Sequence, residues 1–274
     1  WIEQGADGWR LDVPGEIKDD EFWAEFRVVV RAANPQAYTL GEIWEVNSHW
    51  VGKHKFDALM NYPFRAAALS FFANDEMDAA QFGDAVERLL TVYPRPHIYA
   101  QFNLLGSHDT ERFLTLCHHD VARLKLALLF QFTYIGAPSI YYGDEIGLTG
   151  GKDPACRGAF EWNKKKWNRD LHHYVKTLAE LRHKYSVLRH GTFKRLLAQG
   201  NLYIFLRRHE NESLIIILNN SHSSFILDLS IKQVGWLNIV KVKDLLSGQK
   251  FRVEDDSIHL NLSKRAGMVL TADD

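Results

Sequence analysis

The stretch Gly8-Trp-Arg-Leu-Asp-Val13 decides the fold class of this chain, because it is a short strand-like run that ends in a carboxylate. Two later stretches have the same form: one run leads up to Glu42, and the run at 101–106 leads into Asp109. Short apolar runs bounded by breaker residues are typical of buried strands. Helical patterns lie between them, and strands that alternate with helices predict a parallel sheet of βα units.

Five strands are expected in this part of the chain, at about 8–13, 38–43, 57–62, 101–106 and 138–142. The helical patterns lie at about 21–33, 64–73, 79–92, 121–133 and 169–185. Polar residues stand at the C-terminal end of nearly every strand, where a (β/α)8 barrel builds its active site. A complete barrel has eight strands, so we expect its C-terminal part, about strands 4–8, with the first three upstream of Trp1. The chain opens without an initiator methionine or a signal peptide, which is typical of a piece of a longer protein.

The pattern changes after about residue 188, where no long helix is expected. Short strand-like runs lie at 202–207, 213–218, 225–229, 240–245 and 268–271, with turn residues between them. Such a series predicts a small antiparallel β-sandwich. The sequence therefore predicts an α/β chain of two domains, a partial barrel over 1–187 and a C-terminal β-sandwich over 188–274.

Composition excludes several classes of partner. The net charge of the 274 residues is −1 and no basic or acidic block occurs, which argues against binding to nucleic acid or to an anionic membrane surface. No apolar run reaches the roughly 18 residues that a membrane-spanning helix needs. Two free thiols at Cys117 and Cys156 are favoured over a disulfide, as in a reducing compartment. Eight tryptophans suit sugar stacking, but an aromatic core explains them equally well.

The three carboxylates Asp12, Glu42 and Asp109 form the pattern that carries chemistry. A barrel would bring the C-terminal ends of their strands to one mouth. Cleavage of a glycosidic bond needs one carboxylic acid to protonate the leaving oxygen and a second carboxylate to attack the anomeric carbon or activate water. Taken singly, each residue could instead cap the helix that follows its strand.

Three segments resemble conserved segments of the α-amylase family of glycoside hydrolases, in that family's order. They are Gly8-Trp-Arg-Leu-Asp-Val13, Gly41-Glu-Ile-Trp44 and Leu104-Leu-Gly-Ser-His-Asp-Thr110. The resemblance implies a retaining mechanism in which Asp12 is the nucleophile, Glu42 the general acid/base and Asp109 the transition-state stabiliser. It also implies that Arg10 orients Asp12 and keeps it ionised, and that His108 donates a hydrogen bond to the sugar at the cleavage point.

Two further segments resemble the group of cyclomaltodextrinases, neopullulanases and maltogenic amylases: Phe56-Asp-Ala-Leu-Met-Asn-Tyr-Pro-Phe64 and the stretch 141–157. In that group the residues matching Asp153 and Arg157 bind glucose units on the non-reducing side, although a loop ion pair is an alternative. The resemblance places Glu16 toward the acceptor subsites and makes Trp44 a wall of the cleft. Trp162 is equally consistent with packing and with binding. Pro14-Gly15 stands where the group usually has Ala-Asn, which leaves the product pattern open.

The resemblance implies an enzyme that cleaves α-1,4 bonds, with α-1,6 bonds as a further option, in maltooligosaccharides, cyclodextrins, starch or pullulan. It implies no required cofactor, no metal in this chain, a structural calcium ion at most in the upstream part, and a homodimer as an option for the longer enzyme. A bacterial cytoplasmic location is favoured over secretion. The alternatives are a carbohydrate-binding or assembly protein without catalysis and a secreted α-amylase or α-glucosidase of the same family. Because an incomplete barrel has open sheet edges, we expect this chain alone to be weakly active or inactive.

Overall fold

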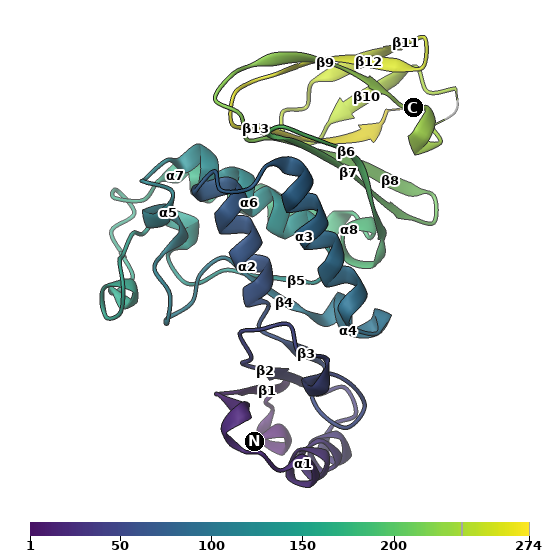
Figure 1. Ribbon diagram of the computed structural model, residues 1–274. Helices are drawn as coiled ribbons and strands as arrows, with labels where there is room; N and C mark the ends of the chain where they lie inside the picture. The colour runs from purple at the N-terminus through teal and green to yellow at the C-terminus, as the bar shows by residue number, and fades with distance from the viewer. Residues whose placement is uncertain (237, 274) are drawn as a thin grey trace.

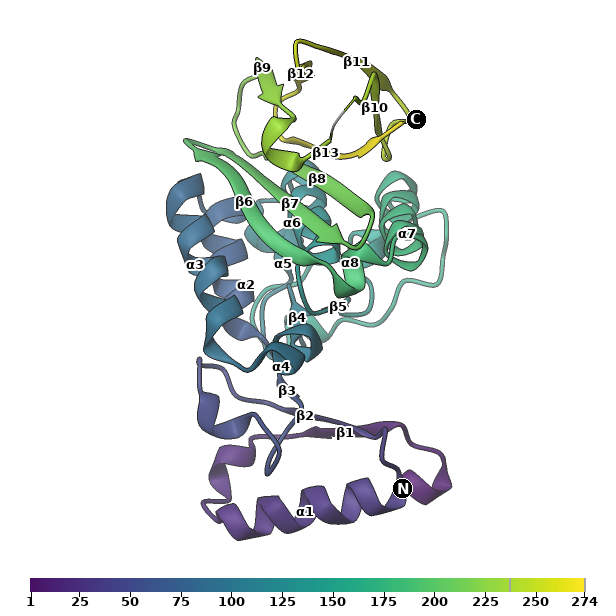
Figure 2. The same cartoon turned by 90° about the vertical axis from the view of Figure 1, so that its right-hand side faces the viewer.

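The computed structural model describes residues 1–236 and 238–273. Three parts follow one another along the long axis of the molecule (Figure 1). A small N-terminal unit is joined to a layer of helices, and the C-terminal strands cover the far side of that layer (Figure 2). The predicted partial barrel followed by an antiparallel β domain is confirmed.

The N-terminal unit is a three-stranded parallel sheet with one long crossover helix. Its strands β1 (Gly8–Leu11), β2 (Tyr38–Gly41) and β3 (Ala58–Leu59) lie in that order. Helix α1 (Asp20–Ala33) connects β1 to β2, and the Asp19 side chain caps it by accepting hydrogen bonds from two backbone N–H groups of its first turn. Short 3₁₀ turns lie at η1 (Ile2–Gln4), η2 (Pro14–Glu16) and η3 (Ser48–Trp50).

Strands β4 (Phe102–Leu104) and β5 (Ala137–Ser139) continue the parallel order. A parallel bridge between Met60 and Phe102 connects β3 to β4. All five predicted barrel strands are therefore present, but each is shorter than predicted. The expected strand at 57–62 ends early because the Asn61 side chain accepts a hydrogen bond from Phe64 N and so caps the next helix.

The helices surround β4 and β5 on the side toward the C-terminal domain (Figure 1). All five predicted helices are found, and the second is divided between an α-helix and a π-helical turn. The short helices α4, α5 and α8 were not predicted, because a helix of four to six residues has too few positions to show a period. The helices are α2 (Tyr62–Ala68), η4 (Leu69–Ala73), α3 (Ala79–Val92), α4 (Arg95–Ala100), α5 (Phe113–Leu116), α6 (Val121–Thr133), α7 (Arg169–Lys184) and α8 (Val187–His190), with 3₁₀ turns at η5 (Asp144–Ile146) and η6 (Ala155–Arg157).

The C-terminal domain is one curled antiparallel sheet of eight strands in the order β6-β7-β8-β13-β10-β11-β12-β9. Five of these strands were predicted. Strands β6, β11 and β12 were not predicted, although β11 and β12 alternate polar and apolar residues as half-buried strands do. The strands are β6 (Thr192–Gln199), β7 (Leu202–His209), β8 (Glu212–Asn219), β9 (Phe225–Ser230), β10 (Lys241–Asp244), β11 (Lys250–Glu254), β12 (Ser257–Leu262) and β13 (Ala266–Ala272), with a 3₁₀ turn at η7 (Lys232–Val234).

One hydrophobic core joins the helices to this sheet. Along β7, Tyr203 and Phe205 belong to the core shared with α3 and α6, whereas Ile204 and Leu206 belong to a second core inside the curled sheet. This is the alternation that a strand buried on both faces produces. Most residues of helix α6 are buried, and the core that they share with β7 joins the two predicted domains. Within the described residues, no helix combines the length and the apolar character needed to cross a membrane.

Arg207, fully buried on β7, is a buried cation at the junction between helices and sheet. It donates to the backbone oxygens of Thr192 (3.0 Å), Gly191 (3.0 Å), Leu188 (3.3 Å) and Thr133. Burial lowers the pKa of Arg207 to about 9. We expect Arg207→Lys to lower the free energy of unfolding by about 2–3 kcal/mol, because a single ammonium leaves some of these oxygens without a donor.

Urea denaturation measures this difference. The control is Arg252→Lys, at an exposed position of β11, which should change the free energy of unfolding by less than about 0.5 kcal/mol. An Arg207→Lys protein as stable as this control would contradict the role assigned to Arg207.

Candidate active site

Asp12 and Glu42 lie side by side because of the register between β1 and β2. Leu11 is paired with Gly41, and Glu42 N donates to Leu11 O at 3.0 Å. Each carboxylate is the first residue after its strand. The parallel direction of the two strands therefore carries both side chains to the same end of the sheet.

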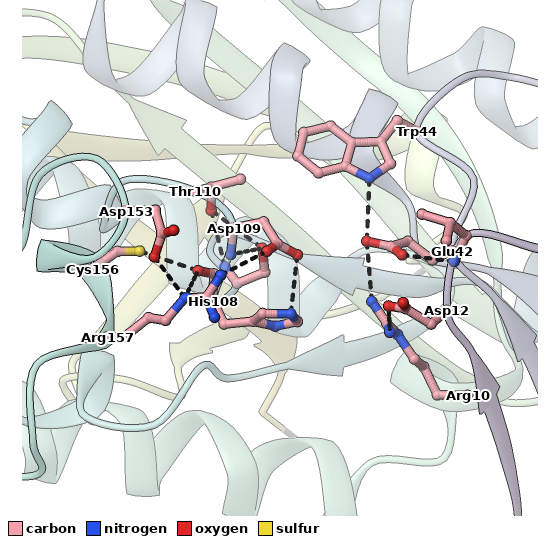
Figure 3. A network of polar contacts seen from close by, with 12 residues as sticks. Arg10, Asp12, Glu42, Trp44, His108, Asp109, Thr110, Asp153, Cys156 and Arg157 are labelled. Atoms are coloured by element: carbon pink, nitrogen blue, oxygen red, sulfur yellow. Dashed lines mark hydrogen bonds and ion pairs between the residues drawn. The ribbon is translucent and has the colours of Figure 1, made fainter.

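Arg10, on β1, bridges the two carboxylates (Figure 3). One guanidinium nitrogen pairs with Asp12 Oδ1, and the other lies 3.0 Å from Glu42 Oε1. The exposure of the two carboxylates differs sharply: the Asp12 side chain is 71% exposed and the Glu42 side chain 4%. Asp12 is thus open to an incoming ligand, whereas Glu42 is held in place.

Three groups fix the Glu42 carboxylate. Besides Arg10, Trp44 Nε1 donates to Oε1 at 3.3 Å, and Val13 N donates to Oε2 at 3.0 Å. Val13 has a φ of 33°, a left-handed conformation that a β-branched residue rarely adopts. This turn aims the Val13 N–H at Glu42 and leads directly into η2. Strained backbone of this kind is often found at functional sites.

Glu16 lies at the end of η2 and lines an open pocket of about 260 Å³ together with Glu42 and Trp44. The pocket therefore reaches from the buried Glu42 carboxylate to Glu16, the residue that was expected to face the acceptor subsites. The other lining residues are Val13, Gly15, Ile43 and Glu45.

Asp109 belongs to a second cluster, which follows β4 (Figure 3). His108 Nε2 lies 3.1 Å from Asp109 Oδ2, and Arg157 Nη2 lies 3.3 Å from Asp109 Oδ1. Arg157 Nε also pairs with Asp153 Oδ1 at 2.7 Å. The structure thus brings four of the predicted residues together, and Asp153 and Arg157 form an ion pair whose two side chains are both partly exposed.

An aromatic pair connects the two clusters. The Trp44 ring stacks on the Tyr62 ring with centroids 3.8 Å apart and planes inclined by 8°. Tyr62 Oη lies 3.2 Å from Ser107 Oγ, which in turn accepts a hydrogen bond from Asp109 N at 3.2 Å. Burial raises the pKa of Tyr62, so its hydroxyl keeps its proton.

Sequence reasoning missed Tyr62 and Ser107. Ser107 had a recognisable signal, since a serine two residues before an aspartate can bond to its backbone N–H. Tyr62 had none, because its contact with Trp44 depends on the position of β2 relative to α2. Trp162 lies apart from both clusters: it is largely exposed and packs edge-on against Phe160 with centroids 4.7 Å apart. Among the described residues, no group of three or more His, Cys, Asp and Glu side chains is arranged to hold a metal ion.

Comparison with known proteins assigns the family. The model of the α-amylase catalytic domain matches residues 1–184, and that of the α-amylase C-terminal domain matches residues 191–270. The chain belongs to the α-amylase family. It therefore belongs to a family of glycoside hydrolases, as its three carboxylate-bearing segments suggested.

Its relatives carry the names of the expected group. A cyclomaltodextrinase from Geobacillus thermopakistaniensis is 44% identical over 266 residues, which cover 96% of this chain and 44% of that protein. Neopullulanase 2 from Thermoactinomyces vulgaris is 42% identical over 275 residues, covering 98% of this chain and 46% of that protein. A solved cyclomaltodextrinase structure superimposes with a TM-score of 0.93 at 40% identity, over the whole of this chain and 46% of that chain. This α-amylase family chain thus spans less than half the length of these relatives.

Gly41 has a steric reason to precede Glu42. A Cβ at this position would lie 2.4 Å from Cδ2 of Phe56, whose ring is buried. We expect Gly41→Ala to lower the free energy of unfolding by about 1–3 kcal/mol, because Phe56 or the end of β2 has to move. The measurement is thermal and urea denaturation. Gly151→Ala serves as the control, since a Cβ there meets no atom within 4 Å. Equal stability of the two variants would show that the ring does not constrain β2.

Proposed function

We propose that the protein is a retaining glycoside hydrolase that cleaves α-1,4-glucosidic bonds through a covalent glycosyl-enzyme. The observation that carries this proposal is the Asp12–Arg10–Glu42 arrangement, with one carboxylate open and the other buried and oriented. A retaining enzyme needs two neighbouring carboxyl groups with these different tasks.

In the first step an oxygen of Asp12 forms a bond to the anomeric carbon while the bond from that carbon to the glycosidic oxygen breaks. Glu42 donates its proton to that oxygen, so the leaving sugar departs as an alcohol. In the second step water gives a proton to Glu42 and attacks the anomeric carbon, which releases Asp12 as a carboxylate. Asp109 and His108 face the sugar hydroxyls and stabilise the distorted ring. No step requires a cofactor.

The substrates we propose are maltooligosaccharides, cyclodextrins, starch or pullulan. The names of the relatives support this choice, since they include cyclomaltodextrinases and a neopullulanase. Asp153 and Arg157 would bind glucose units on the non-reducing side, and Glu16 and Trp44 would face the acceptor. Two buried free thiols, Cys117 and Cys156, favour a cytoplasmic location. A homodimer of the complete enzyme and cleavage of α-1,6 bonds are further parts of the proposal.

Azide rescue of the protein expressed from its complete gene tests the proposed roles. We expect Asp12→Ala and Glu42→Ala to lower kcat on a maltooligosaccharide by about 10³-fold or more. With α-maltosyl fluoride as the substrate of Asp12→Ala, azide should attack from the face where the Asp12 carboxylate lies in the parent protein and give β-maltosyl azide. In Glu42→Ala the glycosyl-enzyme still forms, so azide should give α-maltosyl azide.

Glu25→Gln, at an exposed position of α1, is the control and should keep the parent activity. Activity retained in either carboxylate variant, or azide products of the opposite configuration, would refute the assignment. A carbohydrate-binding protein without catalysis is the alternative, and it is disfavoured because all three carboxylates are retained.

The 274 residues alone should be weakly active or inactive. Among the described residues, β1 pairs only with β2 and β5 only with β4, so both outer edges of the parallel sheet are open. Val28 and Val29 of α1 are exposed, as is Ile140 beyond β5. Exposed edges and apolar side chains of this kind favour association. Size-exclusion chromatography combined with a chromogenic maltoside assay tests this prediction, which a monomeric and fully active chain would contradict.

A further inference from the structure

We propose that Arg65, on α2, is a positioning residue for Asp109 that acts through the backbone of the turn carrying it. This inference rests on the proposed function, because it assigns Asp109 to the stabilisation of the sugar. It adds a residue that lies outside the three family segments and has no predicted contact with substrate.

Arg65 holds the two ends of this turn at once. Its Nε donates to Leu105 O at 2.9 Å, and its Nη2 donates to Glu111 O at 3.2 Å. Asp109 lies between these two residues. A guanidinium is planar and rigid, so two hydrogen bonds from one group fix the separation and the orientation of both carbonyls.

The turn itself is internally tied, so it responds to Arg65 as a unit. Ser107 N donates to Thr110 Oγ1 at 3.0 Å, and Asp109 N donates to Ser107 Oγ at 3.2 Å. The His108 carbonyl accepts from Arg157 Nε at 3.0 Å and from Cys156 Sγ at 3.1 Å. The loop after β5 therefore holds the middle of the turn, while α2 holds its ends through Arg65.

The guanidinium of Arg65 that makes these contacts is a partly buried cation. Burial lowers the pKa of Arg65, and no carboxylate lies within 4.0 Å of its guanidinium among the described residues. Desolvating a cation costs free energy, which the carbonyl contacts and the more distant carboxylates of Glu111 and Asp144 have to offset. Arg182 and Arg207 make contacts of the same kind elsewhere in the chain, so the inference rests on where the two carbonyls of Arg65 lie, on either side of Asp109.

A second arginine shows how the far side of the turn is anchored. Arg112, almost fully buried, donates from Nη1 to Tyr142 O and to Asp144 Oδ1, both at 2.8 Å. Its backbone N donates to Gly150 O at 3.0 Å. Arg112 thus links the residue after the turn to the loop beyond β5. Two residues of α2 reach the turn: the Tyr62 hydroxyl contacts Ser107 in its middle, and Arg65 holds both of its ends. Because Arg65 is the one of the two that binds both ends of the turn, its change should move Asp109 relative to Tyr62 and Trp44.

The test is Arg65→Lys in the protein expressed from its complete gene, assayed on a chromogenic maltoside. We expect kcat to fall by about tenfold or more while KM changes less than about threefold, since the ground-state contacts of the sugar remain. The matched control is Arg182→Lys. Arg182 is also a largely buried arginine on a helix that donates to backbone oxygens, Phe132 O at 2.8 Å and Leu188 O at 3.0 Å, and it lies on α7. The Arg182→Lys substitution should lower the melting temperature and leave kcat unchanged.

A double-mutant cycle separates positioning from a merely structural role. In an Asp109→Asn background, Arg65→Lys should cause little further loss of kcat, because the group that Arg65 positions is already gone. The same fold-loss with and without Asp109 would overturn the proposal, as would a loss of thermal stability with kcat retained.

A crystal structure of Arg65→Lys gives a result that does not depend on activity. The turn from 105 to 111 should be displaced relative to α2, and an unmoved Asp109 would overturn the proposal. If the parent protein hydrolyses no glucan, the proposed function fails, whereas this structure still decides whether Arg65 sets the position of Asp109.

Discussion

The bridge that Arg10 forms between Asp12 and Glu42 is the interaction on which the rest of the site depends. Two carboxylates at neighbouring strand ends repel each other, and a guanidinium between them removes that repulsion while fixing their relative position. The bridge requires the β1–β2 register that sets Leu11 opposite Gly41. At this point of the register Gly41 has no side chain, and the Phe56 ring lies close to where a Cβ would be. The space available at Gly41 in the sheet therefore bears on the ion pairs that Arg10 makes in the site.

The two clusters are coupled through a chain of side-chain contacts that runs from Trp44 to Ser107. Trp44 bonds to Glu42 and stacks on Tyr62, and Tyr62 contacts Ser107, which supports the backbone of Asp109. Trp44 is exposed, but the links beyond it join buried or half-buried groups, so a shift of Tyr62 or Ser107 loses a packing contact or a hydrogen bond. The proposed acid/base residue Glu42 and the proposed stabiliser Asp109 are thus placed by one continuous path.

Sequence alone predicted the class of fold, the order of the five barrel strands and the strand ends that carry Asp12, Glu42 and Asp109. These features are local: an apolar run, a following carboxylate and a helical period can each be recognised in a few residues. What the sequence could not provide is long-range. The stacking of Trp44 on Tyr62, the grip of Arg65 on Leu105 and Glu111, and the shared core of α6 and β13 all join segments whose spacing follows no pattern. The C-terminal end of β3 was predicted too late in the chain for the same reason, since Asn61 acts as a helix cap rather than as a strand residue.

The narrow connection between the N-terminal unit and the rest of the molecule explains why the two clusters need additional support. Figure 1 shows the β1–α1–β2–β3 unit projecting from the helical layer, which it joins near β3. The Met60–Phe102 bridge and the hydrogen bond from Asn61 Nδ2 to Asn103 Oδ1, at 2.8 Å, cross this connection. In a closed barrel the outer edges of β1 and β5 would be fixed by neighbouring strands, and the site would be held from both sides. Where those edges are open, the distance between Asp12 and Asp109 depends on these contacts, on further hydrogen bonds across the connection such as Tyr38 Oη to Ala100 O at 2.7 Å, and on the Trp44–Tyr62 stack. The chemistry proposed for the three carboxylates therefore depends on a geometry that is only as rigid as this connection.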